Sequence, residues 1–407
     1  MQIAFITSEF VTEKECGGLG IYLDNISAIL SEHGHKVTII TLSGCEGELS
    51  YKNNIDVIRV KRTRVEPLKD DINASLNMLE NSWKLFKALK RANRNGIFNI
   101  VQSANYQAVG FFREHKLPTI VRVSSDSSLL RNAAEASFDY QRALKQKKIG
   151  DIIELMCVKH ADAAYAPSSF CARTVTRRCG KKIDVIESPF VKKDMELDDV
   201  IYRTQLEGKE YLLFNSALSS LKGTHLGIEV TDYILSTYPK LNLVYVGSDG
   251  GIRQSNGSCQ NIEGILRRQC DKYNGRVVYL GKIDHTKLYP IIQNSLACIL
   301  PSRVDNLPNA CIEAMSCGKI VIGTYGASFE QLIKNKYNGL LIQRDSAHAL
   351  IKAIKYLLEL SVQEREQMGL RAEEVSMRLQ PEKIYSQVIA YYQQAINNFE
   401  TRGRLLK

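Results

Sequence analysis

The sequence has one tryptophan and nine prolines in 407 residues, and it has no run near the roughly 20 apolar residues that span a bilayer. These absences exclude a proline-rich or collagen-like chain and leave only peripheral membrane contact. None of the ten cysteines forms a Cys-x-x-Cys pair, so we expect reduced, cytosolic thiols and neither a redox motif nor a zinc knuckle. The first residues, MQIAFITSEF, lack the basic segment of a secretory signal and predict a buried strand.

The residues that are present suit a soluble protein with large cores. Hydrophobic residues make up 44% of the chain and charged residues 24%. Lys and Arg number 54 against 44 Asp and Glu, and this net charge of +10 suits anionic partners such as phosphates or acidic lipids. No nucleic-acid-binding motif is present, so we expect no nucleic-acid partner.

Short apolar runs alternate with helical patterns along most of the chain. This alternation predicts an α/β protein built from parallel, doubly wound sheets. The predicted strands are 3–7, 37–41, 55–62, 97–102, 119–123, 163–166, 183–186, 211–215, 241–247, 277–280, 297–300 and 320–323. The polar, acidic stretch 194–208 indicates a linker between two domains.

The predicted organisation is two Rossmann-like domains, 1–193 and 194–380, followed by a helix and tail over 381–407. Apolar residues of this tail share one helical face that would dock back on the body. We expect the two domains to face each other across a cleft at the carboxyl ends of their strands, where open α/β sheets bind ligands.

Two loops offer phosphate-binding chemistry. Gly17 and Gly18 join the first strand to a helix, so their amides and the helix N-terminus suit a phosphate, although a simple tight turn is the alternative. Lys222, in SSLKG, follows the strand 211–215, where its ammonium would neutralise a diphosphate; the alternative is a solvated loop lysine.

The segment 301–333 places two carboxylates around the start of a helix. Pro308 suits the first helical turn and Gly318 the helix end, so Asp305 precedes the helix and Glu313 lies within it. Each carboxylate can accept hydrogen bonds from vicinal hydroxyls of a sugar or a ribose. A solvated helix surface is the alternative interpretation.

In these motifs the chain resembles glycosyltransferase family 4, which has the GT-B fold. The matching segments are Gly17-Gly18 before a helix that ends in HGHKVTII, SSLKG, VGSDGG, VVYLGKI, DNLPNACIEAM and GASFEQLI. The resemblance implies a retaining transferase that moves a hexose from a nucleotide-diphosphate sugar to a glycan or lipid-linked acceptor in surface polysaccharide or glycoconjugate synthesis. The second domain would bind the donor and the first domain the acceptor.

The resemblance also assigns roles. Glu313 would hold the donor ribose, while Asp305 stands where the family has a longer glutamate. Lys222 would bind the diphosphate, but its usual partner arginine is replaced by Ala217, and Arg253 or Arg303 is the candidate substitute. The other expected donor-binding residues are Gly17, Gly18, Gly247, Gly281, Asn306, Leu307 and Glu330.

The first domain departs from the family at the loop after the strand 119–123. Ser124 occupies the place of a histidine, and a hydroxyl cannot replace imidazole as a base. We expect Ser124, together with Asp305 and Lys222, at the catalytic centre. Ser125 and Asp126 would position the donor sugar or the acceptor, and Arg122 would pair with a phosphate or cap the sheet edge.

No Asp-x-Asp sequence occurs in the chain, so we expect neither a metal ion nor another cofactor. Lys222, backbone amides and a helix N-terminus would stabilise the leaving diphosphate instead. The resemblance implies attack on the same face of the sugar without a protein nucleophile.

The helix predicted over 76–94 is basic and amphipathic. Leu76, Leu79, Trp83, Phe86 and Leu89 share a face, which would contact an anionic membrane or cover the protein's own sheet. We expect a cytoplasmic enzyme, and the first of these alternatives would place it at the inner face of the membrane. Two other functional classes stay open: an epimerase-like nucleotide-sugar enzyme, and a catalytically weak nucleotide-sugar-binding protein, which the residues Ala217, Asp305 and Ser124 favour.

Overall fold

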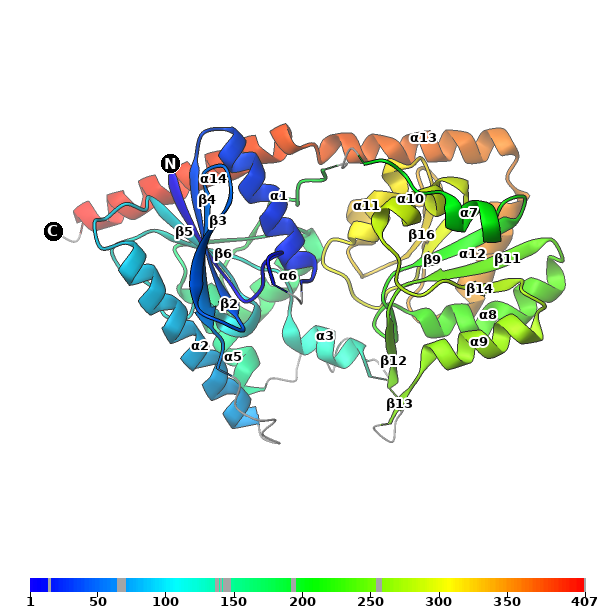
Figure 1. Ribbon diagram of the computed structural model, residues 1–407, viewed down its shortest axis with the longest axis horizontal. Helices are drawn as coiled ribbons and strands as arrows, with labels where there is room; N and C mark the ends of the chain where they lie inside the picture. The colour runs from blue at the N-terminus through cyan, green and yellow to red at the C-terminus, as the bar shows by residue number, and fades with distance from the viewer. Residues whose placement is uncertain are drawn as a thin grey trace. The chain divides into compact units, whose positions relative to one another are not determined.

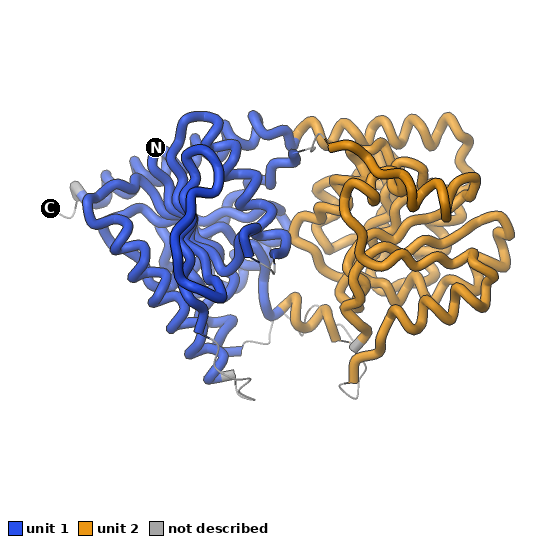
Figure 2. The backbone as a smooth tube through the Cα atoms, in the orientation of Figure 1, with its two compact units in different colours: residues 1–128, 144–191, 379–407 blue, residues 129–143, 192–378 orange. Residues whose placement is uncertain are grey.

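The computed structural model describes residues 1–13, 16–63, 71–135, 139, 141, 148–191, 195–253 and 258–405. The chain splits into two compact units (Figure 2). Unit 1 comprises residues 1–128, 144–191 and 379–407, and unit 2 comprises residues 129–143 and 192–378. The sequence-based division places residues 129–143 with the first half of the chain, whereas in the structure they belong to unit 2.

Unit 1 is built on a sheet in the order β3-β4-β2-β1-β5-β6-β7-β8. Its pairs are parallel except for β3 against β4. The strands are β1 (Gln2–Thr7), β2 (Lys36–Ser43), β3 (Gly47–Lys52), β4 (Ile55–Lys61), β5 (Ile100–Ala104), β6 (Thr119–Arg122), β7 (Ala163–Ala166) and β8 (Asp184–Val185). The strand order reverses between β1 and β5, so the sheet is doubly wound.

Helices cover both faces of this sheet (Figure 1). They are α1 (Gly18–Glu32), α2 (Asp71–Ala92), η1 (Tyr106–Ala108), α5 (Ile149–His160), α6 (Ser169–Cys179) and α14 (Pro381–Leu405). Helix α3 (Ser127–Ala133) begins in unit 1 and continues into unit 2 from residue 129. Helix α1 packs with α14, while α2 packs with α5 and α5 with α6.

Unit 2 contains a six-stranded, fully parallel sheet in the order β14-β11-β9-β15-β16-β17. These strands are β9 (Glu210–Asn215), β11 (Leu241–Val246), β14 (Val277–Tyr279), β15 (Ala297–Leu300), β16 (Ile320–Thr324) and β17 (Leu340–Ile342). Numbered along the unit, the order is 3-2-1-4-5-6, the Rossmann order with its switch point between β9 and β15. A small second sheet joins β10 (Leu218–Ser219), β12 (Asp249–Arg253) and β13 (Cys259–Gln260).

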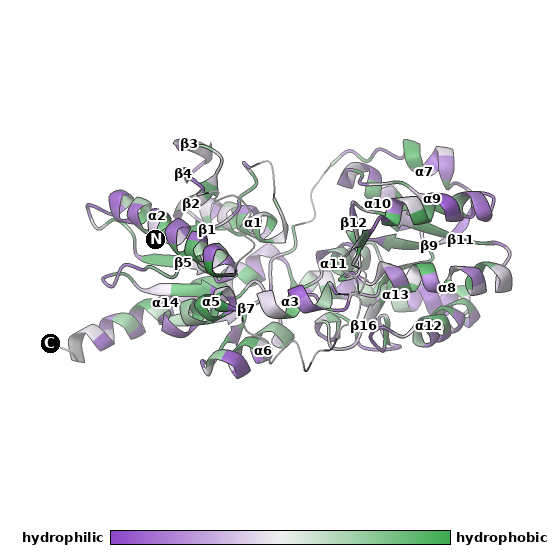
Figure 3. Cartoon of the chain, turned by 90° about the horizontal axis from the view of Figure 1, so that it is seen from below, coloured by the Kyte–Doolittle hydropathy of each residue, from purple (hydrophilic) through white to green (hydrophobic). Residues whose placement is uncertain are grey.

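The helices of unit 2 complete the predicted alternation. They are α7 (Val200–Gln205), α8 (Thr224–Thr237), α9 (Ile262–Lys272), α10 (His285–Asn294), α11 (Asn309–Ser316), η2 (Phe329–Gln331), α12 (Ala347–Glu359) and α13 (Val362–Arg378). Helices α8, α9 and α12 share a core with the sheet, and α11 packs with α13. Figure 3 shows hydrophobic residues along the strands β9 and β11 and mixed colouring on the helices, as expected for strands buried on both faces.

The predicted α/β fold with two doubly wound, Rossmann-like units is confirmed. The edge strand β3, the small sheet and β17 were not predicted, because each is short or polar and lacks a periodic apolar pattern. Helix α7 lies within the predicted linker.

The C-terminal helix docks on unit 1, as predicted. Ile384, Val388 and Tyr392 of α14 are all buried. The Tyr392 hydroxyl donates to Gln102 Oε1 of β5 over 2.6 Å, and the Tyr391 hydroxyl donates to the carbonyl of Ala164 in β7. The chain therefore returns to its first unit after completing the second.

Candidate functional site

The switch point of unit 2 brings two predicted catalytic residues together. Lys222 follows β9 and Asp305 follows β15, and these strands are neighbours in a parallel sheet. The Lys222 Nζ atom lies 2.5 Å from Asp305 Oδ2, and the two side chains are 26% and 15% exposed. A cation and a carboxylate that remain accessible at a carboxyl edge form a site able to bind a ligand with both phosphate and hydroxyl groups.

Two glycines allow the loops at this edge to approach each other. Gly223 has a φ of +74°, and a Cβ atom there would lie 1.9 Å from the carbonyl oxygen of Pro301. A Cβ atom on Gly247 would lie 1.9 Å from the carbonyl oxygen of Ser216, and the Gly247 amide donates to Gly281 over 2.9 Å. Gly247 and Gly281, both predicted to bind the donor, therefore join the loops after β11 and β14.

The loop after β15 carries the rest of the predicted set. The Asn306 amide donates to Asp305 Oδ1 over 2.9 Å, and Leu307 is buried just before α11. The hydroxyl of Ser328 donates to the carbonyl of Asp305 over 2.8 Å, which ties this loop to the loop after β16. In that second loop Glu330 is exposed, and its carboxylate accepts a hydrogen bond from the Gly326 amide.

Glu313 lies within α11 and Asp305 precedes it, as predicted. The Glu313 side chain is 18% exposed, and its Oε1 atom lies 3.4 Å from His285 Nε2 at the start of α10. His285 was missed, because a lone histidine after a predicted strand carries no motif. The structure therefore places an accessible histidine beside the predicted ribose carboxylate.

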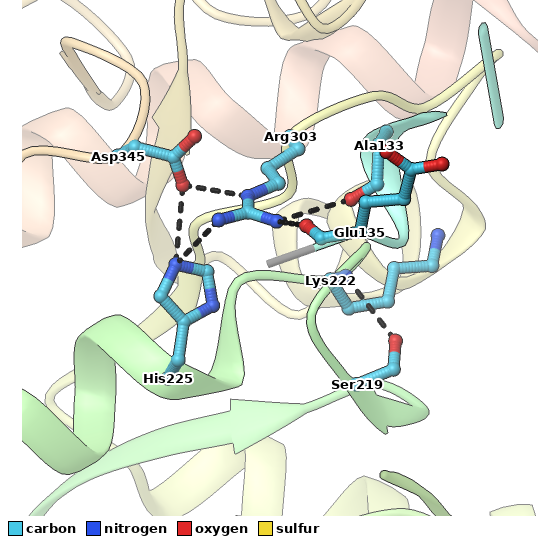
Figure 4. Close-up of polar contacts among 7 residues, drawn as sticks. All are labelled: Ala133, Glu135, Ser219, Lys222, His225, Arg303 and Asp345. Atoms are coloured by element: carbon cyan, nitrogen blue, oxygen red, sulfur yellow. Dashed lines mark hydrogen bonds and ion pairs between the residues drawn. The ribbon is translucent and has the colours of Figure 1, made fainter. Parts of the chain in front are cut away.

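Arg303, proposed as a substitute for the missing cation at Ala217, is committed to other partners (Figure 4). It is 5% exposed, its Nε donates to Asp345 Oδ1 over 2.7 Å, and its Nη1 donates to the carbonyls of Ala133 and Glu135. Arg303 therefore anchors residues 133–135 within unit 2 instead of presenting a free guanidinium. The side chain of Arg253, the other candidate, lies outside the described residues.

Asp345 has a pKa below its ordinary value. Burial alone would raise this pKa, but hydrogen bonds from His225 and Arg303 stabilise the carboxylate and lower it. The His225 Nε2 atom lies 3.1 Å from Asp345 Oδ1. This ionised carboxylate neutralises the buried guanidinium of Arg303 and explains why that arginine is stable in the interior.

In unit 1, the loop after β6 gathers the acceptor-side candidates. The Arg122 Nη1 atom donates to Ser124 Oγ over 3.2 Å. Asn105, which follows β5, accepts from the Ser124 amide and donates to the Ser125 carbonyl, each over 2.7 Å. Asn105 therefore holds this loop in place, and Ser124 and Ser125 are both half-buried, so the loop is partly accessible.

Asp126, in the same loop, is neutralised by an arginine that the sequence did not single out. Arg178 of α6 forms an ion pair with both carboxylate oxygens of Asp126, and both side chains are only 4% exposed. Asp126 is therefore buried and paired with Arg178, and it stabilises the loop after β6.

The amides predicted to bind phosphate at the start of α1 have an internal partner. Those of Gly17 and Gly20 each donate to Glu9 Oε1 over 3.1 Å. Gly18 is the first residue of the helix, and Gly17 is exposed. A carboxylate from the loop after β1 thus occupies the position where an anion is favoured at a helix N-terminus.

A buried carboxylate supports the acceptor-side loops. Glu154 of α5 is 6% exposed, and it accepts from the Gln107 amide over 2.8 Å. Burial raises its pKa to about 7; the Ser127 hydroxyl and the Gln107 amide lower it, and the neighbouring Asp151 and Asp126 raise it. Gln107 has a φ of +57°, so Glu154 stabilises a strained backbone.

Glu154→Gln is expected to flatten the pH dependence of stability. The pKa of Glu154 in the folded protein is raised from 4.5 to about 7. Its contribution to the free energy of unfolding is therefore fully present below pH 4.5 and is lost as the pH rises through 7. The glutamine has no charge to desolvate, so the variant should gain about 2 to 3 kcal/mol relative to wild type between pH 5 and pH 8. Urea unfolding at both pH values measures this change. The exposed Glu48→Gln is the control, and an equal pH dependence in wild type and Glu154→Gln would contradict the expectation.

Among the described residues, no group of three or more His, Cys, Asp or Glu side chains is placed to hold a metal ion. No helix in the described part of the chain has the length and apolarity needed to cross a membrane.

Comparison with known families accounts for both units. Residues 16–190 match the family described as Glycosyltransferase Family 4, and residues 202–375 match Glycosyl transferases group 1. The two matches lie one after the other and leave only short segments uncovered, and the first of them corresponds largely to unit 1 and the second to unit 2.

Two distant relatives are similar to this chain over about nine tenths of their length. A Campylobacter jejuni enzyme that adds N-acetylgalactosamine to a diNAcBac-PP-undecaprenol glycan is 20% identical, over 88% of this chain and 89% of its own length. Spore coat protein SA of Bacillus subtilis is 19% identical over 91% and 93%.

Solved structures show the same fold. The sucrose-phosphate synthase of Thermosynechococcus elongatus has a TM-score of 0.73 at 20% identity, covering 97% of this chain and 98% of that one. Anabaena HepE, solved with UDP, has a TM-score of 0.70 at 16% identity, covering 97% of this chain and 100% of that one. With its two doubly wound units and both family matches, the chain belongs to glycosyltransferase family 4 and is a GT-B glycosyltransferase.

Proposed function

We propose that this enzyme transfers a hexose, with retention of anomeric configuration and without a metal ion, from a nucleotide-diphosphate sugar to a glycan or lipid-linked acceptor. The observation that carries the proposal is the Lys222–Asp305 pair at the switch point of unit 2, with Glu313 on the helix that follows. Two similar proteins support it: HepE has been solved with UDP-glucose, and the Campylobacter relative acts on an undecaprenol-linked glycan.

In this mechanism, protein cations and dipoles stabilise the negative charge of the leaving diphosphate in place of a metal ion. Lys222 exchanges its partner Asp305 for the diphosphate and stabilises the charge that develops as the sugar leaves. Asp305 is then free to accept hydrogen bonds from hydroxyls of the transferred sugar. Glu313 accepts hydrogen bonds from the ribose hydroxyls, and His285, 3.4 Å away, orients that carboxylate.

Retention follows from attack on the face that the diphosphate leaves. The acceptor hydroxyl forms its bond to the anomeric carbon directly, so no protein nucleophile is required. A leaving phosphate oxygen takes the proton of that hydroxyl, so no protein base is required. Ser124 contributes a hydroxyl that positions a substrate and does not act as a base.

The decisive experiment is a screen of purified protein with UDP-, GDP- and ADP-sugars in EDTA, following thermal stability and nucleotide release. One nucleotide family should raise the melting temperature, because a bound ligand stabilises the fold by mass action, and it should be released slowly without metal. Activity only after addition of Mg²⁺ or Mn²⁺ would refute metal independence. Conversion of the donor sugar without an acceptor would favour an epimerase, and binding without any turnover would favour a binding protein.

Glu313→Ala is expected to raise the donor KM by about tenfold or more, since the lost charge-assisted hydrogen bonds stabilise by about 1 to 3 kcal/mol. Glu313→Gln, which keeps one acceptor oxygen, should lie between the alanine variant and wild type. Initial-rate kinetics with varied donor at saturating acceptor measures both. An unchanged donor KM combined with a raised acceptor KM would remove Glu313 from the donor site.

We also propose peripheral contact with an anionic membrane through α2, at the inner face of a cytoplasmic membrane where polysaccharide precursors are assembled. Leu85 and Leu89 of α2 are buried against unit 1, while Leu76 and Trp83 are 57% and 41% exposed. Trp83 lies beneath the ammonium of Lys87, at 5.4 Å from the ring centroid. Exposed apolar side chains beside lysines are typical of helices that lie in a membrane interface.

The variant Lys87→Glu/Lys90→Glu is expected to lower binding to vesicles of phosphatidylcholine and phosphatidylglycerol by about tenfold or more, because each basic residue near an anionic surface contributes about 1 kcal/mol. Cosedimentation at low salt measures this change. The pair Lys352→Glu/Lys355→Glu on α12 of unit 2 is the matched control, since it makes the same charge change on another helix. Equal losses in both variants, or no binding of wild type, would refute a specific membrane surface.

A further inference from the structure

A buried guanidinium lies at the carboxyl end of the unit 1 sheet. Arg122 is the last residue of β6 and is paired in register with Tyr165 of β7. It is 5% exposed, and its guanidinium carbon lies 3.6 Å from the centre of the Tyr22 ring. The ring provides a cation–π contact that stabilises the charge without neutralising it.

The described residues satisfy only part of the hydrogen-bonding capacity of Arg122. Its Nη1 atom donates to Ser124 Oγ over 3.2 Å, and its Nη2 atom donates to Ser188 Oγ over 2.9 Å. Its Nε atom is buried and has no hydrogen-bond partner in the described part of the chain. A guanidinium carries five N–H donors, so two neutral hydroxyls leave most of its capacity unused.

Among the described residues, no carboxylate forms an ion pair with Arg122. The acid in the adjoining loop, Asp126, is already paired with the buried Arg178. Two arginines are thus buried near one loop, and one acid neutralises only one of them. A buried cation without a counter-charge is costly for the folded state, and a bound anion would remove that cost.

The surroundings of Arg122 are built to hold it in place. The Tyr22 hydroxyl is 2.7 Å from that of Tyr165, which donates to Gln102 Oε1 over 2.8 Å. Tyr392 of α14 donates to the same oxygen. This network fixes the ring under the guanidinium, and Asn105 fixes the Ser124 loop above it.

We propose that Arg122, with the hydroxyls of Ser124 and Ser188, binds a phosphate group of the acceptor. The inference rests on the proposed function, in which the acceptor is lipid-linked, and it adds that the linking phosphate is recognised. Ser124 and Ser188 are half-buried, so they line the accessible side of the site. The Ser188 hydroxyl can rotate to donate to a phosphate oxygen, while the planar guanidinium suits a tetrahedral anion.

Calorimetric titration of the full-length protein tests this inference with farnesyl diphosphate, inorganic pyrophosphate and UDP as probes. Arg122→Gln should raise the Kd of farnesyl diphosphate and of pyrophosphate at least tenfold and leave the Kd of UDP within twofold. The exposed Arg173→Gln is the control for loss of one positive charge from the same unit. The variant Ser124→Ala/Ser188→Ala keeps the buried charge of Arg122 and removes the two hydroxyls. It should raise the Kd of farnesyl diphosphate and of pyrophosphate, and it provides a folded protein for the test even if Arg122→Gln does not fold.

Three results would overturn the inference: no binding of farnesyl diphosphate to wild type, equal binding to wild type and both variants, or a loss of UDP binding as large as the loss for the lipid probe. The last result would assign Arg122 to the donor. These titrations need no turnover, so they separate the two proposals. Phosphate binding that depends on Arg122 in a protein without transferase activity would support this inference while refuting the proposed function.

Discussion

Replacing Lys222 with alanine is expected to lower kcat/KM for transfer by about 100-fold or more, which corresponds to roughly 3 kcal/mol of transition-state stabilisation. Lys222 is the cation that the structure places at the switch point of unit 2, where its Nζ atom contacts Asp305 over 2.5 Å. The family resemblance places a second cation where this chain has Ala217, and Arg303, one of the two candidate substitutes, is engaged with Asp345. The lysine therefore has few substitutes, and steady-state kinetics with varied donor should show the loss mainly in kcat.

A double variant separates the catalytic role of Lys222 from its role as a partner of Asp305. Lys222→Ala leaves a carboxylate of 15% exposure without its cation, which alone could disturb the loop. In Lys222→Ala/Asp305→Asn that charge is removed as well, so a purely structural defect would be repaired. Asp305 itself is proposed to bind the transferred sugar, so Asp305→Asn alone is the reference for the double variant. We expect the double variant to be far less active than Asp305→Asn, and Lys282→Ala, an exposed lysine after β14, to retain normal activity. Recovery of activity in the double variant would contradict the direct role of Lys222.

Gly223→Ala is expected to destabilise unit 2 by about 3 to 5 kcal/mol, within the range of strongly disruptive single substitutions. Gly223 has a φ of +74°, and the added Cβ atom would lie 1.9 Å from the Pro301 carbonyl oxygen. Relief of that overlap requires the loop after β9 to move away from the loop after β15. The same movement would separate Lys222 from Asp305, so folded protein should also lose activity.

Gly275→Ala is the matched control for this substitution. Gly275 has a φ of +75°, and no atom lies within 4 Å of the position that an added Cβ atom would take, so only the cost of the left-handed backbone remains. We expect that cost to be about 1 kcal/mol. Urea unfolding of both variants, followed by tyrosine fluorescence and by circular dichroism, measures the difference. Equal destabilisation by the two substitutions would show that the contact with Pro301 is easily relieved.

Sequence patterns predicted the parallel strands well, because strands buried on both faces are continuous apolar runs that need no tertiary information to be recognised. The same patterns placed Lys222, Asp305 and Glu313 at strand ends or on the following helix. Since parallel strands share one carboxyl edge, the neighbourhood of these three residues could be inferred before their contacts were known. Short polar elements such as β3 and β13 could not be found this way, because pairing with distant strands decides them.

Individual charged partners were the part that sequence could not supply. Arg303 lies in the segment 301–333 and Arg178 in no predicted motif, but each forms an ion pair with a carboxylate more than 40 residues away. The Glu9 carboxylate accepts from the Gly17 amide that was predicted to bind phosphate. Side chains compete for the same donors and acceptors, and only the folded arrangement determines which partner is near enough.

The sequence by itself determined the α/β alternation, the order of the motifs and hence the family, because these depend on local periodicity and on residues at fixed spacing along the chain. Only the tertiary structure decided which charges are available to a ligand. It committed Arg303 to Asp345, paired Arg178 with Asp126, and left Arg122 with two hydroxyls and a ring. The physical reason is that the cost of a buried charge depends on its neighbours in space, and these come from segments whose separation along the chain says nothing about their distance.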